Sequence, residues 1–302
     1  MSSAGLPSRP RRPLVFRDPA HREAVRRVLD EVRSGCDIAA RKARDPVEFV
    51  HRYRDLADRE LVALLAACLA FGNVTTIRAK LEDALARLGP SPSSAAEDRG
   101  GLLARLEGFV HRLFRGEDVA ALLFGARALQ RRHGILGEAF RLELGASNGD
   151  LQSALSRFAG ALREAGGLPR GGPRRGPSHL LPDVASGAGG KRLLLFLRWM
   201  IRPADGVDLG LWAIPPGVLL CPVDTHIHKL ARNLGLTTRS SAGWRTASEI
   251  TEALRLFDPE DPVKYDFSLC HLGMATRCLE RQHEVRCEGC GARPACRHWR
   301  RG

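Results

Sequence analysis

Residues 221–226 have the sequence Cys-Pro-Val-Asp-Thr-His, and they mark the start of a helix. Pro222 favours an extended conformation for the residue before it, so the lead-in is not helical. Asp224 is a good N-cap, and apolar residues then recur with helical spacing at Ile227, Leu230, Ala231 and Leu234. Gly235 predicts the end of the helix. We therefore expect Asp224 at the positive end of a short amphipathic helix, where a carboxylate stays ionised, although the same pattern also fits a helix cap with no further role.

A glycine-rich stretch lies upstream and ends in a lysine. Leu-Leu-Pro at 180–182 is followed by Gly-Ala-Gly-Gly-Lys at 187–191. Glycines permit positive φ and let backbone N–H groups approach a phosphate closely. The candidate phosphate contacts are therefore Gly187, Gly189 and Gly190. The alternative is an ordinary turn between two helices. Lys191 begins a mostly apolar helix that ends near Pro203. The positive helix end and the apolar core favour a neutral, nucleophilic amine, whereas the alternative role is a simple phosphate contact.

The chain has 302 residues and a formal net charge of +13, which predicts a polyanionic partner, most simply nucleic acid. Residues 1–18 are rich in proline, arginine and serine, and we expect them to form a disordered basic arm without a signal-peptide segment. No apolar run in the sequence is long enough to span a bilayer. We therefore expect a cytoplasmic, nucleoid-associated protein with no membrane partner, whose eight cysteines are not disulfide-bonded.

Four cysteines near the C-terminus have the spacing of a metal site. They follow the pattern C-x8-C-x2-C-x5-C at Cys278, Cys287, Cys290 and Cys296. Four closely spaced thiols in a cytosolic protein predict an iron–sulfur cluster or, alternatively, zinc, because a four-cysteine zinc site has the same number of ligands. Arginines surround these cysteines, and Arg293 and Arg297 are candidate contacts to a phosphate backbone. We interpret Cys270, which lies outside the pattern, as a core residue.

The rest of the chain predicts helices and no strands, since it has few β-branched runs and no strict alternation. Helical spacing of apolar residues begins at Pro19. The segment 59–71 is apolar nearly all round, as expected for a buried helix, with Asp58 as its cap and Cys68 as a core residue. Further helices are expected over 76–88 and within 101–165, with a Pro/Ser loop at 89–100 and a flexible basic loop at 165–178. The predicted fold class is all-α.

The order of these features resembles that of the helix-hairpin-helix DNA glycosylases of the endonuclease III type. The features are the glycine-rich stretch, Lys191, the Val-Asp-Thr-His helix start and the four-cysteine tail. The whole chain also resembles a bacterial family, DUF2400, that looks related to that superfamily. The resemblance to the glycosylases covers residues 180–300, and the chain departs from it by an insertion before the glycines and by a longer first cysteine gap. Lys191 and Asp224 are 33 residues apart, which is more similar to the archaeal 8-oxoguanine glycosylases. The intervening segment 205–212 accounts for the difference.

The resemblance implies a helix-hairpin-helix glycosylase-like fold with two helical lobes and a C-terminal iron–sulfur loop held by four cysteines. Residues 19–57 would join the lobe that carries the cluster. Residues 58–235 would form a helical barrel with the hairpin and Lys191, and residues 236–302 would form the C-terminal helices and the [4Fe–4S] loop. The active site would lie in the cleft between the lobes.

Residue roles also follow from the resemblance. In that family a lysine at the place of Lys191 attacks C1′ of the sugar, and an aspartate at the place of Asp224 deprotonates the lysine or water, or stabilises the oxocarbenium-like sugar. Arg192 beside the hairpin would contact DNA. Asn73 follows the buried helix, where the family carries the residue that fills the gap left by a flipped base. Two tryptophans would either stack on that base or lie in the core: Trp199 and Trp212.

These features together predict a monomeric DNA base-excision repair glycosylase with AP-lyase activity, which acts on a damaged base, such as an oxidised one, in double-stranded DNA. Two other classes stay open. One is a non-catalytic DNA-binding protein that keeps the fold, the cluster and the basic surface. The other is a zinc-containing structural or regulatory protein.

Overall fold

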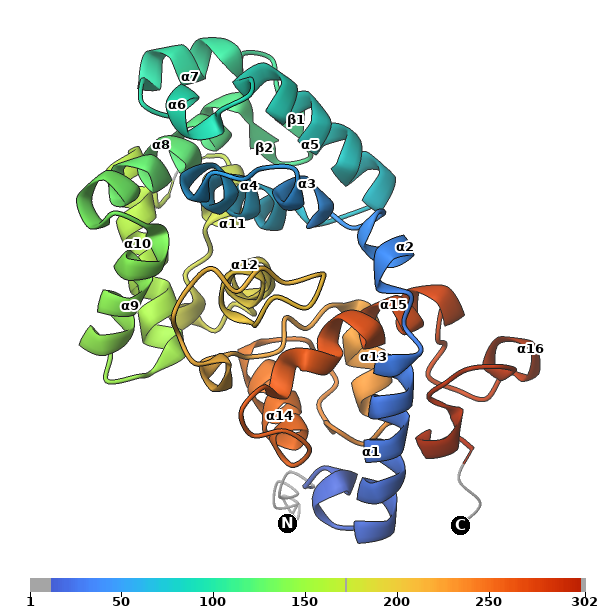
Figure 1. Cartoon of the computed structure of the whole chain (residues 1–302). Coiled ribbons are helices and arrows are strands. Elements are labelled where there is room, and N and C mark those ends of the chain that lie inside the picture. Colours follow the sequence, from blue (N-terminus) through green and yellow to red (C-terminus); the bar gives the residue numbers. More distant parts are fainter. Residues whose placement is uncertain (1–11, 172, 300–302) are drawn as a thin grey trace, which may run out of the picture.

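The computed structural model describes residues 12–171 and 173–299, and nearly all of its regular structure is helical (Figure 1). The all-α prediction is confirmed for this part of the chain, with one exception. Residues 110–115 form a small antiparallel hairpin of β1 (Val110–His111) and β2 (Phe114–Arg115) where we expected a helix. The hairpin forms because His111 Nε2 bonds to Leu69 O at 3.1 Å and Phe114 is buried in the core.

The helices before the glycine-rich stretch are α1 (Pro19–Ser34), α2 (Ile38–Lys42), α3 (Glu48–His51), α4 (Leu56–Leu69), α5 (Val74–Leu88), α6 (Pro92–Ala95), α7 (Arg99–Arg105), α8 (Gly116–His133), α9 (Leu136–Ala146) and α10 (Leu151–Gly166). The later ones are α11 (Gly176–Leu180), α12 (Lys191–Ile201), α13 (Thr225–Asn233), α14 (Trp244–Arg255), α15 (Asp266–Thr276) and α16 (Glu284–Cys287). Short 3-10 helices are η1 (Leu14–Phe16), η2 (Val184–Ser186), η3 (Pro216–Val218), η4 (Pro262–Tyr265) and η5 (Arg293–Ala295). In the described ranges, none of these helices is both long and apolar enough to cross a membrane.

The predicted disordered arm is wrong for residues 12–18. Val15 in η1 is buried, and its N–H donates to Gly235 O at 3.4 Å. An apolar side chain with a place in the core is ordered by its burial, whatever the composition around it. Residues 1–11 of the arm lie outside the described residues.

Two predictions at helix starts need correction. The cap of α4 is Asp55, whose Oδ1 accepts a hydrogen bond from Asp58 N at 3.0 Å. Asp58 lies in the first turn, is buried, and accepts a hydrogen bond from Ser93 N at 2.7 Å, which ties α4 to α6. The predicted loop at 89–100 therefore contains α6 and the start of α7, because Ser91 acts as a helix cap.

The helices form two lobes, which we name the α4 lobe (α3–α12) and the α13 lobe (α1 and α13–α16) (Figure 1). The chain crosses between the lobes at α2 and again between α12 and α13. Within the predicted N-terminal segment 19–57, α1 packs on α15 and η5, whereas α3 packs on α4. Both ends of the described chain thus contribute to the α13 lobe.

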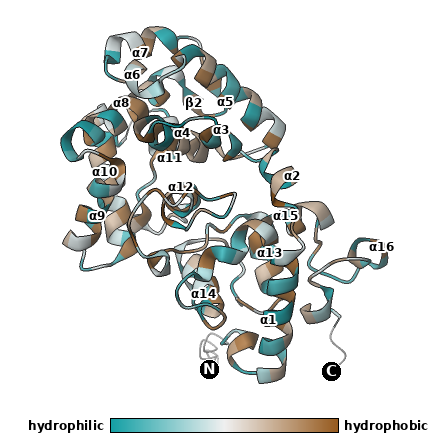
Figure 2. Ribbon diagram, viewed as in Figure 1, coloured by the Kyte–Doolittle hydropathy of each residue, from teal (hydrophilic) through white to brown (hydrophobic). Residues whose placement is uncertain are grey.

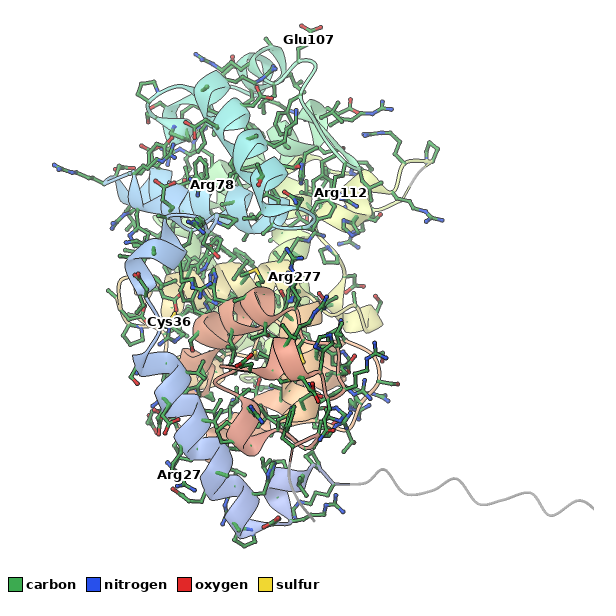
Figure 3. All side chains as sticks on the ribbon, turned by 90° about the vertical axis from the view of Figure 1, so that its right-hand side faces the viewer. Arg27, Cys36, Arg78, Glu107, Arg112 and Arg277 are labelled. Carbon is green, nitrogen blue, oxygen red and sulfur yellow. The ribbon has the colours of Figure 1, made fainter. Side chains whose placement is uncertain are left out.

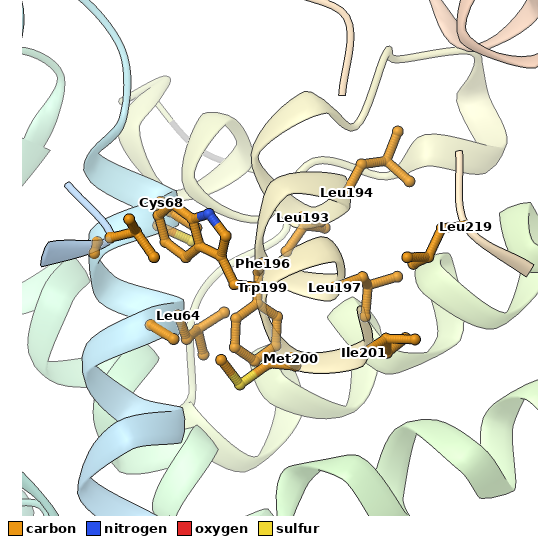
Figure 4. Packing of buried hydrophobic residues seen from close by; sticks show 14 of the residues in the cluster. Leu64, Cys68, Leu193, Leu194, Phe196, Leu197, Trp199, Met200, Ile201 and Leu219 are labelled. Carbon is orange, nitrogen blue, oxygen red and sulfur yellow. The ribbon is translucent and has the colours of Figure 1, made fainter. Parts of the chain in front are cut away.

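The contact between α4 and α12 is the centre of the α4 lobe. Residues 61–69 of α4 are all fully buried, as its apolar circumference predicted. Leu64 and Cys68 lie beside Phe196 and Trp199 of α12 (Figure 4). Cys68 is a core residue as predicted, and Trp199 is a core residue rather than a surface for a base, since it is 0% exposed. The peripheral helix α10 alternates hydrophilic and hydrophobic residues, because only one of its faces is buried (Figure 2).

The segment 202–214 between α12 and α13 is part of the core. Asp208 is fully buried and pairs with Arg198, at 3.0 Å between Nε and Oδ1, and with Arg202. Trp212 is also a core residue, because it is 3% exposed and its Nε1 donates to Glu60 Oε1 at 2.7 Å. These buried contacts hold the C-terminal end of α12, the helix that begins with Lys191.

The helices α13 and α15 approach each other closely at Gly273. A Cβ on Gly273 would lie 2.9 Å from Cβ of His226, a distance that real side chains do not adopt. Glycine therefore allows this approach, which sets the distance between Asp224 at the start of α13 and Cys270 on α15.

Candidate active site and cysteine loop

A cleft of about 1180 Å³ lies between the two lobes. Lys191 lines it from the α4 lobe, and Asp224 lines it from the α13 lobe. The remaining wall is partly apolar and partly charged with both signs. It includes Phe71, Leu195, Phe267, Met274, the arginines Arg41, Arg44, Arg198 and Arg277, and the carboxylates Asp37, Asp45 and Asp266. The fold thus brings together in one cleft two residues that are 33 positions apart in the sequence.

Lys191 is the first residue of α12. Gly190 before it has φ +59° and takes the N-cap position, and no side chain caps this helix. The first N–H groups of α12 therefore have no side-chain acceptor and are free for an external anion. Lys191 is half-buried, and no ion pair among the described residues includes it.

Asp224 caps α13, as predicted. Its Oδ1 accepts hydrogen bonds from His226 N at 2.9 Å and Ile227 N at 2.7 Å. Its Oδ2 accepts a hydrogen bond from the thiol of Cys270 at 3.5 Å. One oxygen therefore fixes the helix start, while the other has only this weak donor among the described residues and remains accessible from the cleft.

Cys270 packs against the core, as predicted, and it also lines the cleft. Burial raises the pKa of Cys270 well above its ordinary value, and the nearby Asp224 and Asp266 carboxylates raise it further. The thiol consequently stays protonated and acts as a hydrogen-bond donor. No local sequence signal identifies this role, because it depends on the packing of α15 against α13.

Three arginines of the cleft wall form no ion pair with a described carboxylate, whereas a fourth, Arg198, pairs with Asp208 and Asp266. Arg41, Arg44 and Arg277 take part in no ion pair within the described ranges. By contrast, Asp45 Oδ1 accepts a hydrogen bond from Val47 N at 2.9 Å, and Asp266 pairs with the buried Arg198. The three unpaired arginines are therefore available to an anionic ligand.

The glycine-rich stretch packs beside the cleft rather than in its wall. Gly187 and Gly190 have φ values of +93° and +59°, so both use a conformation that favours glycine. A Cβ on Gly189 would lie 3.6 Å from Cα of Gly243, which places the stretch against the start of α14. The helix before it, α11, has only five residues, and the 3-10 helix η2 lies between α11 and the glycines.

We predicted that Arg192 contacts DNA, but the residue is buried inside the α4 lobe. It is 8% exposed, its Nη1 donates to Cys68 O at 2.8 Å, and its guanidinium lies over the rings of Phe71 and Phe114. The prediction is wrong because the helical repeat places Arg192 on the face of α12 that packs on α4. Its charge is satisfied by carbonyl groups and ring faces inside the lobe.

Asn73 is exposed at the start of α5, next to residues of the cleft wall. Its Oδ1 accepts hydrogen bonds from Thr75 N at 2.9 Å and Thr76 N at 3.4 Å, so its side chain is a helix cap. Contact with DNA at this residue stays a prediction. Arg112, between β1 and β2, and Arg277 of the α13 lobe are both visible from one side of the molecule (Figure 3).

The four C-terminal cysteines lie in residues 277–299, which we name the cysteine loop. Asn233 at the end of α13 donates from Nδ2 to Cys278 Sγ at 3.0 Å. Cys290 N donates to Cys287 O at 3.3 Å, which closes a tight turn between these two cysteines. Burial raises the pKa of Cys296, and the thiols of the other three cysteines raise it further.

The donor chemistry of the cysteine loop fits a thiolate-bound metal. Nearby backbone N–H groups lower the pKa values of Cys290 and Cys296 against the larger, opposing effect of burial. Hydrogen bonds from backbone N–H groups to sulfur are typical of thiolate ligands. In the described residues, no group of three or more His, Cys, Asp or Glu side chains is arranged to hold an ion. An iron–sulfur cluster or zinc at the cysteine loop therefore stays a prediction.

The two arginines predicted to contact DNA from this loop lie outside the cleft wall. Arg293 is exposed, and its guanidinium lies 4.0 Å from the ring centroid of Trp299. Arg297 is also exposed, and its backbone N–H donates to Asn233 O at 2.8 Å. A phosphate contact by either residue would form a surface separate from the cleft.

The fold and the cleft define a helical protein with a charged cleft between its two lobes. The chain belongs to the DUF2400 family, whose model, described as a protein of unknown function, matches residues 45–275. The matched region contains Lys191, Asp224 and Cys270 and ends before Cys278, so the cysteine loop lies outside it. No curated protein and no solved structure matches the chain significantly.

Proposed function

We propose that this protein is a DNA glycosylase with AP-lyase activity, which removes a damaged base from double-stranded DNA and then cuts the strand. The observation that carries the proposal is the shared cleft, in which the amine of Lys191 and the carboxylate of Asp224 lie with three arginines that form no ion pair with a described carboxylate. The resemblance of the glycine-rich stretch, Lys191 and the Val-Asp-Thr-His start to the helix-hairpin-helix glycosylases supports it.

Binding of the DNA backbone would use the three unpaired arginines of the cleft. Arg41, Arg44 and Arg277 are available for phosphate oxygens, because no carboxylate among the described residues holds them. The uncapped first turn of α12 offers N–H groups at a positive helix end. Together these groups suit a bent or opened duplex whose backbone passes Lys191.

The chemistry would start at Lys191. Its Nζ forms a bond to C1′ of the sugar while the C1′–base bond breaks, and the base leaves with the bonding electrons and takes up a proton. The amine passes its own proton to Oδ2 of Asp224. Ring opening then gives a Schiff base between Nζ and C1′, and loss of a C2′ proton expels the 3′ phosphate. The Asp224 carboxylate also stabilises the positive charge that develops on the sugar.

The direct test is a panel of duplexes, each with one oxidised, deaminated or alkylated base or an abasic site. We expect excision on at least one lesion, followed by strand cleavage. Asp224→Asn should reduce the excision rate by about 10² or more, because it removes a preorganised charge and retains the size of the side chain. Salt-sensitive binding with no excision on any lesion would contradict the proposal and favour a non-catalytic DNA-binding protein.

A further inference from the structure

Asn233 is a buried polar residue whose side chain contacts the cysteine loop. It is the last residue of α13 and is 2% exposed. Its Nδ2 donates to Cys278 Sγ at 3.0 Å. Its Oδ1 lies 3.2 Å from Nε2 of His298, which donates in the tautomer protonated there. Its backbone oxygen accepts a hydrogen bond from Arg297 N at 2.8 Å.

These bonds favour the metal-binding form of the loop. A buried amide is costly unless its groups are hydrogen-bonded, so the loop is held at this place on α13. The donor directed at sulfur holds the Cys278 side chain in one orientation, as hydrogen bonds to metal ligands generally do. We infer that Asn233 is a positioning residue of the cysteine site, which stabilises Cys278 as a ligand and fastens the loop to α13.

The same helix connects the cysteine loop to the cleft. α13 has nine residues, with Asn233 at its end and Asp224 as its N-cap. The close contact at Gly273 leaves no room for α13 to approach α15 further, because a Cβ there would meet His226 at 2.9 Å. A metal in the cysteine loop therefore orders α13 and, through it, the Asp224 carboxylate. The consequence for catalysis rests on the proposed function, whereas the ordering itself does not.

Cobalt(II) is the probe, because its visible absorption reports tetrahedral thiolate coordination whichever metal the protein carries in the cell. The metal-free full-length protein is titrated with Co²⁺ alone. Asn233→Asp keeps the size of the side chain but cannot donate to Cys278, and removal of such a hydrogen bond typically weakens metal binding by about 10- to 100-fold. Arg232→Ala is the matched control, because Arg232 binds Glu280 of the same loop at 2.6 Å and contacts no cysteine sulfur. Its affinity should stay within about threefold of wild type, as for a partly exposed ion pair that does not hold a ligand.

Amide hydrogen exchange tests the connection to the cleft without any substitution. In the wild-type protein, Co²⁺ should slow exchange across residues 226–234, and Arg232→Ala should respond in the same way. Wild-type Co²⁺ affinity in Asn233→Asp, or no Co²⁺ binding by the wild-type protein, would overturn the assignment of Asn233. Tight Co²⁺ binding with unchanged exchange in α13 would overturn the connection to Asp224. None of these results uses DNA, so failure of this inference is distinct from failure of the proposed function.

Discussion

The thiol of Cys270 donates a hydrogen bond to Oδ2 of Asp224 across 3.5 Å, from one helix of the α13 lobe to another. Because the other oxygen of Asp224 accepts two backbone N–H groups, this bond fixes the remaining rotation of the carboxylate. The carboxylate thus faces the cleft in one orientation. This bond requires the closest approach of α13 and α15, one turn away at Gly273.

Gly273→Ala should disrupt this geometry. The added methyl would lie 2.9 Å from Cβ of His226 and 3.3 Å from Cδ1 of Leu230, so the two helices must separate. Overpacking of this kind costs about 1–3 kcal/mol, which urea denaturation can measure. We also expect slower excision, because Asp224 moves relative to Lys191.

Gly145→Ala is the matched control, since this helical glycine of α9 has nothing within 4 Å of an added Cβ. Alanine favours helix over glycine, so the variant should be as stable as wild type or more stable by about 0.5–1 kcal/mol. Equal stability of Gly273→Ala and wild type would contradict the close packing of α13 and α15.

Charge reversal in the cleft should weaken binding to undamaged duplex. Arg41→Glu or Arg277→Glu removes a cation without an acidic partner, so fewer counterions are released on binding. The slope of log K against log salt should become shallower by about one for each phosphate that the variant no longer neutralises. Arg27→Glu, at the far end of the α13 lobe (Figure 3), should keep the wild-type slope. Equal slopes in all these variants would exclude the cleft as the DNA-binding surface.

Glu48 should make stability depend on pH. Its hydrogen bonds with Arg52 hold the pKa of Glu48 below its ordinary value, and Arg78 adds to this effect against the opposing effect of burial. A lowered pKa means that the stabilisation is present above the unfolded-state pKa and is lost as the pH falls through the folded-state pKa. Glu48→Gln should therefore cost about 0.5–1 kcal/mol at pH 7 and have little effect near pH 2.

Urea titrations at both pH values measure this difference. Glu107→Gln is the control, because the Glu107 side chain is exposed at the tip of the α4 lobe (Figure 3) and forms no ion pair within the described residues. It should have no effect at either pH. An undiminished effect of Glu48→Gln near pH 2 would mean that packing rather than charge carries its contribution.

The cysteine loop should bind an iron–sulfur cluster. Protein purified without oxygen should be brown and contain about four iron and four acid-labile sulfide per chain, as a cubane with four cysteine ligands requires. Cys290→Ser should remove the colour, whereas Cys36→Ser, which changes a cysteine far outside the spacing pattern, should not. One zinc per chain with no iron would contradict the cluster and favour the zinc alternative.

Local signals in the sequence predict the elements that carry the cleft. The start and end of each helix depend on residues within one or two helical turns. This holds for the N-cap of α13 at Asp224, its end near Gly235 and the start of α12 at Lys191. The buried helix α4 is equally visible, because its apolar residues occupy its whole circumference.

Features that depend on tertiary contacts escape this kind of prediction. Arg192 has the composition of a surface residue, yet its face of α12 packs on α4, where carbonyls and rings satisfy the guanidinium. Cys270 resembles any apolar cysteine until α15 is placed beside α13. The β-hairpin at 110–115 shows no alternation of apolar and polar residues in the sequence, because each of its strands has only two residues.

Borohydride trapping followed by peptide mapping tests the central claim most directly. The sequence contains five lysines, Lys42, Lys80, Lys191, Lys229 and Lys264, and among them only Lys191 lines the cleft. Incubation with an abasic-site duplex and borohydride should reduce a Schiff base to a stable adduct, which mass spectrometry should locate on Lys191. Lys191→Ala should abolish the adduct and still bind the duplex, and Lys42→Ala, beside the cleft on α2, should form it at the wild-type level. An adduct that persists in Lys191→Ala, or no adduct in the wild-type protein, would contradict the assignment of Lys191 as the nucleophile.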